Sequence, residues 1–550
     1  MYNEIVISNH FYHKGKVQTS IKELSELLQC SERYTKTIVR QLEETGTIHW
    51  ETARGRGKKP FIQVLQSPIE LLKNDMETLW NRGKITEAFD YAKQFDLYDH
   101  PEIQAFIQQH LGVKQLGEEH IFRQQMYPVQ LFLDPLRMLS RHDGHMAEQI
   151  HETLFTYEQN DIKPNLVFKF DTEDYKTWNF ILRKGLYFHN GEMVTAKDAV
   201  TSIEHTLPYY KTIIAFDHAV TVNRYRFTVT LKEANRHFLA VLASHRMSIF
   251  PHTKNFEIGC GPFMLKEYLD ERITLQVFPQ YFKQRPWIDR VELFIEKEAF
   301  ESPIHYEPLA EPSVKLQKKE EGATFIWLNS TRDALSCAKK RKALWHFINP
   351  SDFIFRKEEI EAFGWMHNSL KYEEEMTDFV LPKFKEPLII GYQQIRATAN
   401  HLECAFVLQE KLRNSGIECE LVCFDLQNPS TLRYDEMDIY IGGNAMDENV
   451  LLSYIVLYRK MLHPLICQLQ SPYKEEVAAL LKEINTSDKP MELFNQLSMY
   501  LQQSSHLKFL KHRHYYTYIK KASNFKNISF DQNGRIDYKA LCVVDGEETI

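Results

Sequence analysis

The length of the chain limits its fold more than any other feature, because a single hydrophobic core stops growing at roughly 250–300 residues. The chain has 550 residues, so it must divide into at least two units. Hydrophobic residues make up 43% of the sequence, which is ample for packed cores and argues against a disordered chain. Near residue 120 the pattern changes from amphipathic helices to short strands mixed with helices. We therefore expect a small helical part followed by a large α/β part.

The net charge of −7 is unevenly distributed. Residues 1–65 contain 10 Lys and Arg against 7 Asp and Glu, a balance of about +3, so the remainder carries about −10. Because residues 1–65 are basic and the remainder is acidic, we expect only residues 1–65 to contact a polyanion.

Several classes of protein are excluded by what the sequence lacks. The start, Met1–Val6, has neither the basic nor the apolar region of a secretory signal, and no apolar run reaches 18 residues. We therefore expect a cytoplasmic protein without membrane contact. The eight cysteines are scattered, and Cys419 and Cys423 have no second pair to complete a zinc site, which favours reduced thiols and no metal or cofactor. No nucleophile elbow, P-loop, dinucleotide fingerprint or His-Glu metal motif occurs, so we assign no catalytic residue and expect no enzyme.

Residues 19–44 predict two short helices separated by a tight turn. Ser20 and Glu23 have the spacing of a capping box, and Ser31 is placed to cap the second helix. The buried side of the second helix is predicted to contain Tyr34, Ile38, Val39 and Leu42. In helix-turn-helix geometry the second helix enters the major groove. The side chains predicted to contact DNA from this helix are Arg33, Thr35, Lys36, Thr37 and Arg40.

A strand, a basic glycine-rich turn and a second strand follow, over residues 48–64. Such a hairpin is a wing, suited to phosphates or the minor groove. The wing residues predicted to contact DNA are Arg54, Arg56, Lys58 and Lys59. Two amphipathic helices alone would fit a generic helical bundle equally well, but the wing favours DNA binding. The segment resembles the winged-helix modules of bacterial regulators, through Ser31–Tyr34 and the basic turn at residues 55–58.

From Ile69 to about Gln115 the apolar spacing predicts a helical connector, with breaks at Arg82-Gly83 and His100-Pro101. We accordingly divide the chain into a winged helix-turn-helix domain (1–66), a helical connector (67–118) and a large α/β domain (119–550).

The large domain contains an ordered series of motifs. They include Ile150–Tyr157, the strand, turn and capped helix of 182–200, Gly259–Leu265, and the strand Thr324–Leu328 with Asn329. This series resembles the family 5 extracytoplasmic solute-binding domains of oligopeptide- and dipeptide-binding proteins. The resemblance implies a two-lobed periplasmic-binding-protein-like (class II) α/β fold that holds its ligand between the lobes. We expect the first lobe at about 119–320 and 505–550, and the second at about 321–504.

The resemblance also suggests ligand-binding residues. An Asp in the second lobe of peptide-binding relatives pairs with the amino group of the peptide, and Asp447 is the matching candidate here. The Asn/Asp-Pro that follows in many relatives is absent, and a surface helix-capping role for Asp447 is an equal alternative. Trp178, Trp327 and Trp365 are candidates to line the cleft, with a position in the core as the usual alternative for tryptophan.

A winged helix, a connector and a family 5 domain, in this order, resemble the SgrR-type regulators. The resemblance implies a transcription regulator that binds double-stranded DNA and a small solute (peptide, sugar, sugar phosphate or similar). It further implies RNA polymerase as a partner and transporter genes as targets. The oligomeric state stays open, with a dimer on DNA as one arrangement. The alternatives are a solute-binding receptor for an ABC importer, and a DNA-binding protein whose large domain serves only for oligomerisation.

Overall fold

The computed structural model describes residues 2–543 with internal gaps. The residues outside the description within this range are 54–57, 127–129, 139–140, 159–160, 296–312, 358, 373–379, 395–400, 426–432, 448, 521–524, 527–528 and 530–534. The chain forms two compact units. The first contains Met1–Pro128, Lys266–Leu275 and Ile288–Glu301, and the second contains the rest.

The first unit begins with a winged helix of three helices and a three-stranded antiparallel sheet of order β1-β3-β2. The predicted capping box is present: the Ser20 side chain accepts from the backbone of Glu23, and the Glu23 carboxylate accepts from the backbone of Ser20. The elements are α1 (Tyr2–Phe11), β1 (Lys16–Gln18), α2 (Ile21–Leu27), α3 (Glu32–Glu44), β2 (Ile48–Glu51) and β3 (Phe61–Val64).

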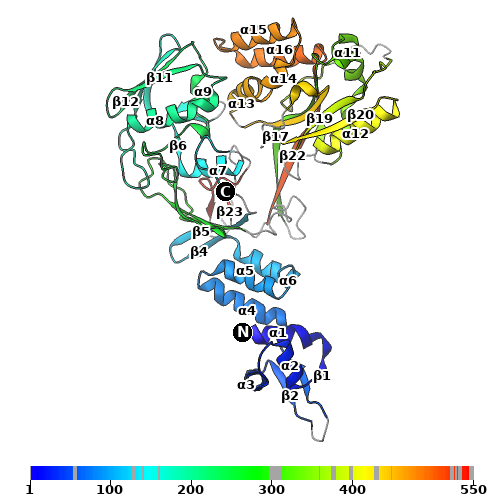
Figure 1. The fold of residues 1–550 in the computed structure, drawn as a ribbon. Coiled ribbons are helices and arrows are strands. Elements are labelled where there is room, and N and C mark those ends of the chain that lie inside the picture. Colours follow the sequence, from blue (N-terminus) through cyan, green and yellow to red (C-terminus); the bar gives the residue numbers. More distant parts are fainter. Residues whose placement is uncertain are drawn as a thin grey trace. The chain divides into compact units, whose positions relative to one another are not determined.

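The connector consists of three helices that lie beside one another (Figure 1): α4 (Pro68–Asn81), α5 (Ile85–Gln94) and α6 (Pro101–His110). Both predicted breaks are confirmed. The helical pattern ends five residues earlier than the expected Gln115, because residues 112–116 form a strand, β4, that pairs antiparallel with β5 (Glu119–Met126). The predicted boundary at residue 118 therefore falls inside a hairpin.

This hairpin belongs to a five-stranded sheet of order β14-β15-β16-β5-β4. Its other strands, β14 (Phe263–Tyr268), β15 (Arg272–Val277) and β16 (Arg290–Ile295), come from the large domain, and β16 runs parallel to β5. Phe294 of β16 is fully buried against the connector, with ring centroids 6.4 Å from Trp80 and 6.0 Å from Phe89. The connector is thus packed onto a sheet made largely by the domain that follows it.

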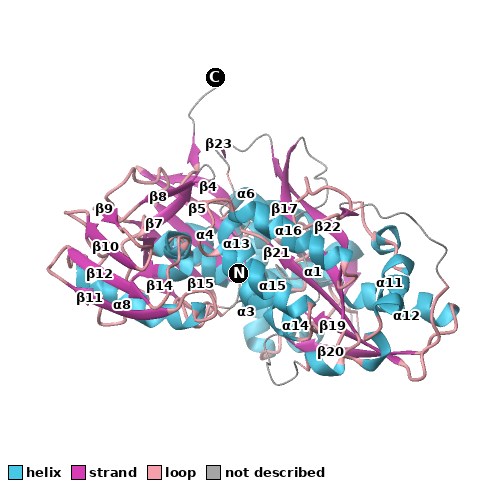
Figure 2. Ribbon diagram, turned by 90° about the horizontal axis from the view of Figure 1, so that it is seen from above, coloured by secondary structure: helices cyan, strands magenta, loops and turns pink. Residues whose placement is uncertain are grey.

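The second unit is α/β, with helices set against its sheets (Figure 2). Its first part contains an antiparallel sheet of order β11-β12-β10-β9, and α8 packs on β11 and β12. The elements are α7 (Arg141–Ile150), β6 (Glu152–Thr153), β7 (Phe155–Glu158), β8 (Asp161–Pro164), β9 (Val167–Asp171), β10 (Thr177–Leu182), α8 (Ala196–Thr206), β11 (Phe216–Thr221), β12 (Arg226–Leu231), α9 (Phe238–Leu242) and β13 (Ser248–Ile249).

Its second part contains a mixed sheet of order β18-β22-β17-β21-β19-β20. The elements are β17 (Ser313–Leu328), α11 (Ala338–Phe347), β18 (Glu359–Glu361), β19 (Leu388–Gln394), α12 (His401–Asn414), β20 (Cys419–Asp425), β21 (Ile439–Ala445), α13 (Val450–Val456), α14 (His463–Cys467), α15 (Tyr473–Ile484), α16 (Pro490–Gln503) and β22 (Leu507–Lys520). Two short strands that follow, β23 (Phe525–Lys526) and β24 (Cys542–Val543), pair with each other in a separate sheet. Residues 507–511 pair with the inner part of β17, so they extend the sheet of the predicted second lobe, although we expected the chain to have left that lobe at 505.

Replacing Phe294 with Ala should destabilise the first unit by about 3–5 kcal/mol, because the change leaves a cavity among Trp80, Phe89 and the sheet. Thermal unfolding followed by circular dichroism measures the effect. Leu116→Ala is the matched control, because Leu116 on β4 of the same sheet is 62% exposed. Equal melting temperatures for the two variants would contradict the assigned contact.

Candidate nucleic-acid interface and inter-lobe contacts

Helix α3 presents cationic side chains on its exposed face, and one of them, Arg40, is paired with Glu44 of the same helix at 2.8 Å. Its N-cap, Ser31, accepts from the backbone N–H of Tyr34 at 3.3 Å, which fixes where the helix begins. Ile38, Val39 and Leu42 are buried in the winged-helix core. The side chains that remain exposed among the predicted contacts are Arg33, Lys36, Thr37 and Arg40. They lie on the side of α3 away from the core, as a recognition helix requires.

The expectation for Thr35 is wrong. Thr35 is fully buried and its hydroxyl donates to the Ser31 carbonyl at 3.0 Å, so it cannot contact DNA. Tyr34, predicted to be buried, is 55% exposed. The physical reason is a stripe displaced by one residue: Thr35, Ile38, Val39 and Leu42 follow the helical spacing of i, i+3, i+4 and i+7, and they fill the core. Tyr34 therefore joins the exposed face, which sequence reasoning missed.

The wing is described only in part, because Arg54 and Arg56 lie outside the described residues. Lys58 is exposed. Lys59 forms an ion pair with Glu23 of α2. The hydrogen bond from Lys59, with that from the Ser20 backbone, lowers the pKa of the Glu23 carboxyl to about 2. Lys59 thus joins the base of the wing to α2, and part of its charge is already neutralised.

Helix α1 was not predicted, although it joins two cores. Its Ile7 and Phe11 lie in the winged-helix core, whereas its Ile5 lies in the core of the connector. A helix that buries residues on different sides has no single apolar stripe, so the usual periodicity does not reveal it. A concentration of Ile, Val and Phe between residues 5 and 11 was the available signal.

Asp447 lies between β21 and α13 and is exposed. Its backbone N–H donates to the Ser453 hydroxyl at 3.0 Å. The cap of α13 is instead Asn449, whose side chain accepts from the backbone of Leu452, so Asp447 does not have the capping role. Burial is the main cause that raises the pKa of Tyr210, and the charge of Asp447 is the smallest of the causes that contribute.

The tryptophans occupy the core rather than a cleft wall. Trp327 and Trp365 are 0% and 1% exposed, and the Trp365 indole donates to the Tyr458 hydroxyl at 3.0 Å. Trp178 is equally buried. The prediction that Trp327 and Trp365 contact ligand is not supported by these positions, because both rings are enclosed by the cluster of apolar side chains at the centre of the second unit.

The two parts of the second unit contact each other directly. One hydrophobic cluster includes Phe238 of the first lobe and Tyr454 of the second. His237 Nε2 lies 2.8 Å from the Ile484 carbonyl, and the Asn449 amide donates to the Ala240 carbonyl at 3.2 Å. These contacts join α9 and its surroundings to α13 and α15.

A cluster of cations lies at the same junction and was not predicted. Lys460 of the second lobe donates to the Tyr209 carbonyl at 3.2 Å, and its Nζ lies 2.8 Å from the centre of the Tyr209 ring. Arg246 of the first lobe lies 4.2 Å from the same ring centre. Burial, together with the charges of Arg246 and Lys211, lowers the pKa of Lys460 to about 7. The junction therefore concentrates positive charge from both lobes.

Within the described ranges, His, Cys, Asp and Glu do not gather in groups of three that could hold a metal ion. Among the same residues, helices long and apolar enough to cross a membrane are absent.

Two family models match the chain. Residues 5–117 match the model described as "Sugar transport-related sRNA regulator N-term", and residues 161–357 match "Bacterial extracellular solute-binding proteins, family 5 Middle". The HTH-type transcriptional regulator SgrR of Escherichia coli O1:K1 / APEC is 24% identical over 78% of this chain and 80% of its own length. The chain has the domain composition of an SgrR-type regulator. The chain is also 29% identical to the uncharacterized protein YhjP of Bacillus subtilis (strain 168), over 52% of each chain, so that match spans about half of the relative.

Solved structures support the fold of the large domain. NikA from Brucella suis, in complex with Fe(III)-EDTA, has a TM-score of 0.63 at 17% identity, covering 77% of this chain and all of that one. HbpA2 from Haemophilus parasuis has a TM-score of 0.61 at 15% identity, with the same coverage. The chain therefore has a periplasmic-binding-protein-like α/β domain behind its N-terminal module. Together, the comparisons support a transcriptional regulator with a solute-binding domain and not an enzyme.

Replacing Thr35 with Ala should lower the stability of the winged helix by about 1 kcal/mol, because a buried hydrogen bond is lost. Thr37→Ala, two residues along the same helix and exposed, should leave the melting temperature unchanged. Differential scanning calorimetry of the two variants measures the contrast. A larger loss for Thr37→Ala would show that α3 packs in a different register.

Replacing Lys460 with Met should raise the melting temperature at pH 7. The folded-state pKa of Lys460 lies below the ordinary 10.5, so holding its charge costs stability at and below pH 7, and the cost disappears as pH rises toward 10.5. The gain should therefore shrink on going to alkaline pH. Thermal melts across this range measure it, with Lys482→Met, at an exposed position of α15, as control. A gain that is independent of pH would contradict the assigned cause.

Proposed function

We propose that the chain is a cytoplasmic, ligand-responsive regulator that binds double-stranded DNA. A small solute held between the lobes of the large domain, with lobe bounds as given above, changes DNA binding or the activation of transcription. The observation that carries the proposal is the exposed cationic face of α3 on a winged helix that shares one compact unit with strands of the solute-binding domain. The sequence similarity to the regulator SgrR supports it.

The mechanism follows from how the units are built. A solute can change the winged helix only if it binds one conformation of the lobes better than another. The chain passes repeatedly between the two units, because Lys266–Leu275 and Ile288–Glu301 belong to the first unit and the intervening residues to the second. A change between the lobes therefore reaches the five-stranded sheet through covalent connections. From there Phe294, the connector and α1 form a continuous packed path to the winged-helix core.

We also propose the solute, the target genes and the protein partners of the chain. The solute is a peptide, a sugar, a sugar phosphate or a similar small molecule, with Asp447 as a contact at the edge of the lobes. The genes controlled include those of a transporter. RNA polymerase is a further partner, and a dimer is the proposed form on DNA, because a single winged helix offers few phosphate contacts.

The deciding experiment is fluorescence anisotropy of the full chain on DNA from upstream of its own gene, across a salt series. Lys36→Ala should weaken binding to all sequences and reduce the slope of log affinity against log salt by about 1, because one phosphate contact is lost. Lys58→Ala should act in the same way. Lys197→Ala, an exposed lysine in the first turn of α8, is the matched control and should have no effect.

Binding no tighter than to scrambled DNA at low salt would contradict the proposal. The chain would then be better explained as a solute-binding receptor for an ABC importer of peptides or other small solutes.

A further inference from the structure

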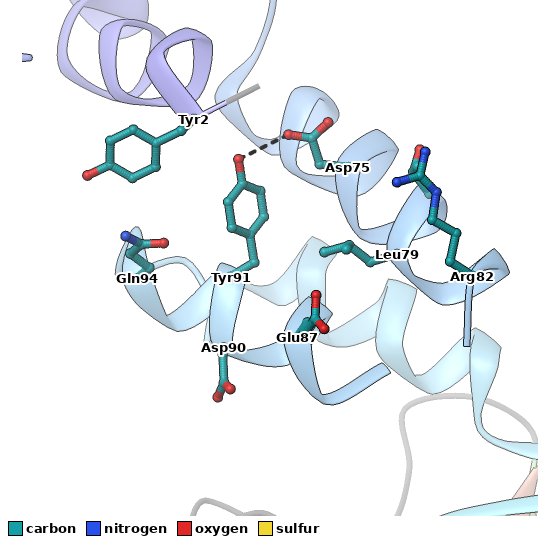
Figure 3. Close-up of a pocket in the computed structure, with 9 residues that line it drawn as sticks. Tyr2, Asp75, Leu79, Arg82, Glu87, Asp90, Tyr91 and Gln94 are labelled. Carbon is teal, nitrogen blue, oxygen red and sulfur yellow. Dashed lines mark hydrogen bonds between the residues drawn. The ribbon is translucent and has the colours of Figure 1, made fainter. Parts of the chain in front are cut away.

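An open pocket of about 640 Å³ lies on the connector, between α4 and α5 and beside the start of α1 (Figure 3). Its volume is within the range of small-molecule sites, roughly 300–1,000 Å³. It is formed entirely by residues of the first unit, so it is separate from the space between the lobes. The proposed function makes no use of it.

One end of the pocket is aromatic. The rings of Tyr2 and Tyr91 both pack on Phe95, with centroid distances of 5.3 and 5.1 Å. Figure 3 shows the two tyrosines at one end, Arg82 at the other and the Leu79 side chain between them. Tyr2 is 47% exposed, so its ring is available to an occupant. The pocket therefore offers aromatic faces and an apolar contact.

The remaining wall is acidic. Asp75, Glu87 and Asp90 line the pocket, and Arg82 is the cation among the residues that line it. The Tyr91 hydroxyl donates to Asp75 Oδ2 at 3.2 Å (Figure 3), which holds this carboxylate at the inner end. Burial is the largest cause and raises the pKa of Asp75 above its ordinary value, whereas the Tyr91 hydrogen bond and the charge of the chain's N-terminal ammonium act in the opposite direction. A positive charge placed in the pocket would offset that cost. Glu87 is already paired with Lys84 at 2.8 Å, so Asp75 and Asp90 are the carboxylates offered to an occupant.

We propose that this pocket binds a small organic cation, a primary ammonium or a guanidinium carried on an apolar or aromatic body. The carboxylate of Asp75 receives the charge, with Asp90 at the exposed edge. The faces of Tyr2 and Tyr91 attract the same cation through their π-electrons, and Leu79 contacts its apolar part. A hydrated metal ion would gain nothing from the aromatic and apolar walls, so an organic cation suits the pocket better.

The position of the pocket gives its occupant access to the winged helix. Tyr2 belongs to α1, and Ile7 and Phe11 of the same helix lie in the winged-helix core. A ligand that contacts Tyr2 together with α4 and α5 therefore stabilises one arrangement of α1 on the connector. The binding site stands on its own geometry, whereas an effect of its occupant on DNA affinity rests on the proposed function.

Isothermal titration calorimetry of the full chain without DNA tests the site. Tyramine, an aromatic ammonium, should bind, whereas tyrosol, its neutral counterpart with a hydroxyl in place of the ammonium, should not. Asp75→Asn keeps the hydrogen bond with Tyr91 but removes the charge, and should weaken tyramine binding about tenfold. Asp99→Asn, an exposed aspartate on the same connector, is the matched control and should bind as the unmodified chain does. Asp90→Asn at the exposed edge gives a second reading that does not depend on the folding of Asp75→Asn.

Equal binding of tyramine and tyrosol, unchanged affinity in both Asp variants, or no binding of tyramine or agmatine up to millimolar concentration would overturn the site. The anisotropy assay repeated with tyramine then tests the coupling. Tyramine binding without a change in DNA affinity would overturn the coupling and leave the site. Failure of the chain to bind DNA at all would remove the proposed function, while the calorimetry would still report on the pocket.

Discussion

The contact of Phe294 with Trp80 and Phe89 is the interaction on which the arrangement of the first unit depends. It joins a strand of the large domain to helices of the connector, although Phe294 follows Trp80 and Phe89 by more than 200 residues in the sequence. Without it the connector would be a tether between a winged helix and a separate solute-binding domain. With it, the winged helix, the connector and the five-stranded sheet form one packed body, and the sheet can transmit a change to α1.

On the candidate DNA-binding helix, neighbouring residues differ completely in burial. A displacement of the apolar stripe by one position exchanges Tyr34 and Thr35 between core and surface. Thr35 tolerates burial because its hydroxyl bonds to the Ser31 carbonyl within the helix. Tyr34 lies at the surface of the same helix as the cations. The exposed face therefore combines charge for phosphates with an aromatic ring that can contact base or sugar.

Two regions of unusual charge have opposite sign. The junction of the lobes concentrates Lys460, Arg246 and Lys211 around Tyr209, where burial and mutual repulsion weaken the protonation of Lys460. The connector pocket concentrates carboxylates beside tyrosine rings. At the junction, packing holds Lys460 close to Arg246 and Lys211, and the repulsion among these cations adds to the effect of burial. Neither region has a sequence signature, because its members come from separate elements.

The sequence by itself determined the local elements and their order. Capping at Ser20 and Ser31, the helix breaks near residues 82 and 100, and the motifs of the large domain are all set by residues close to one another in the chain, so their patterns are readable. The tertiary structure alone decided which sides of these elements are covered. Helix α1 escaped detection because two cores bury different sides of it, β4 replaced a helical end because it pairs with β5, and Trp327 and Trp365 lie in a core formed by distant segments. The burial of a side chain depends on residues that folding brings near it from distant parts of the sequence, so a local sequence pattern does not predict it.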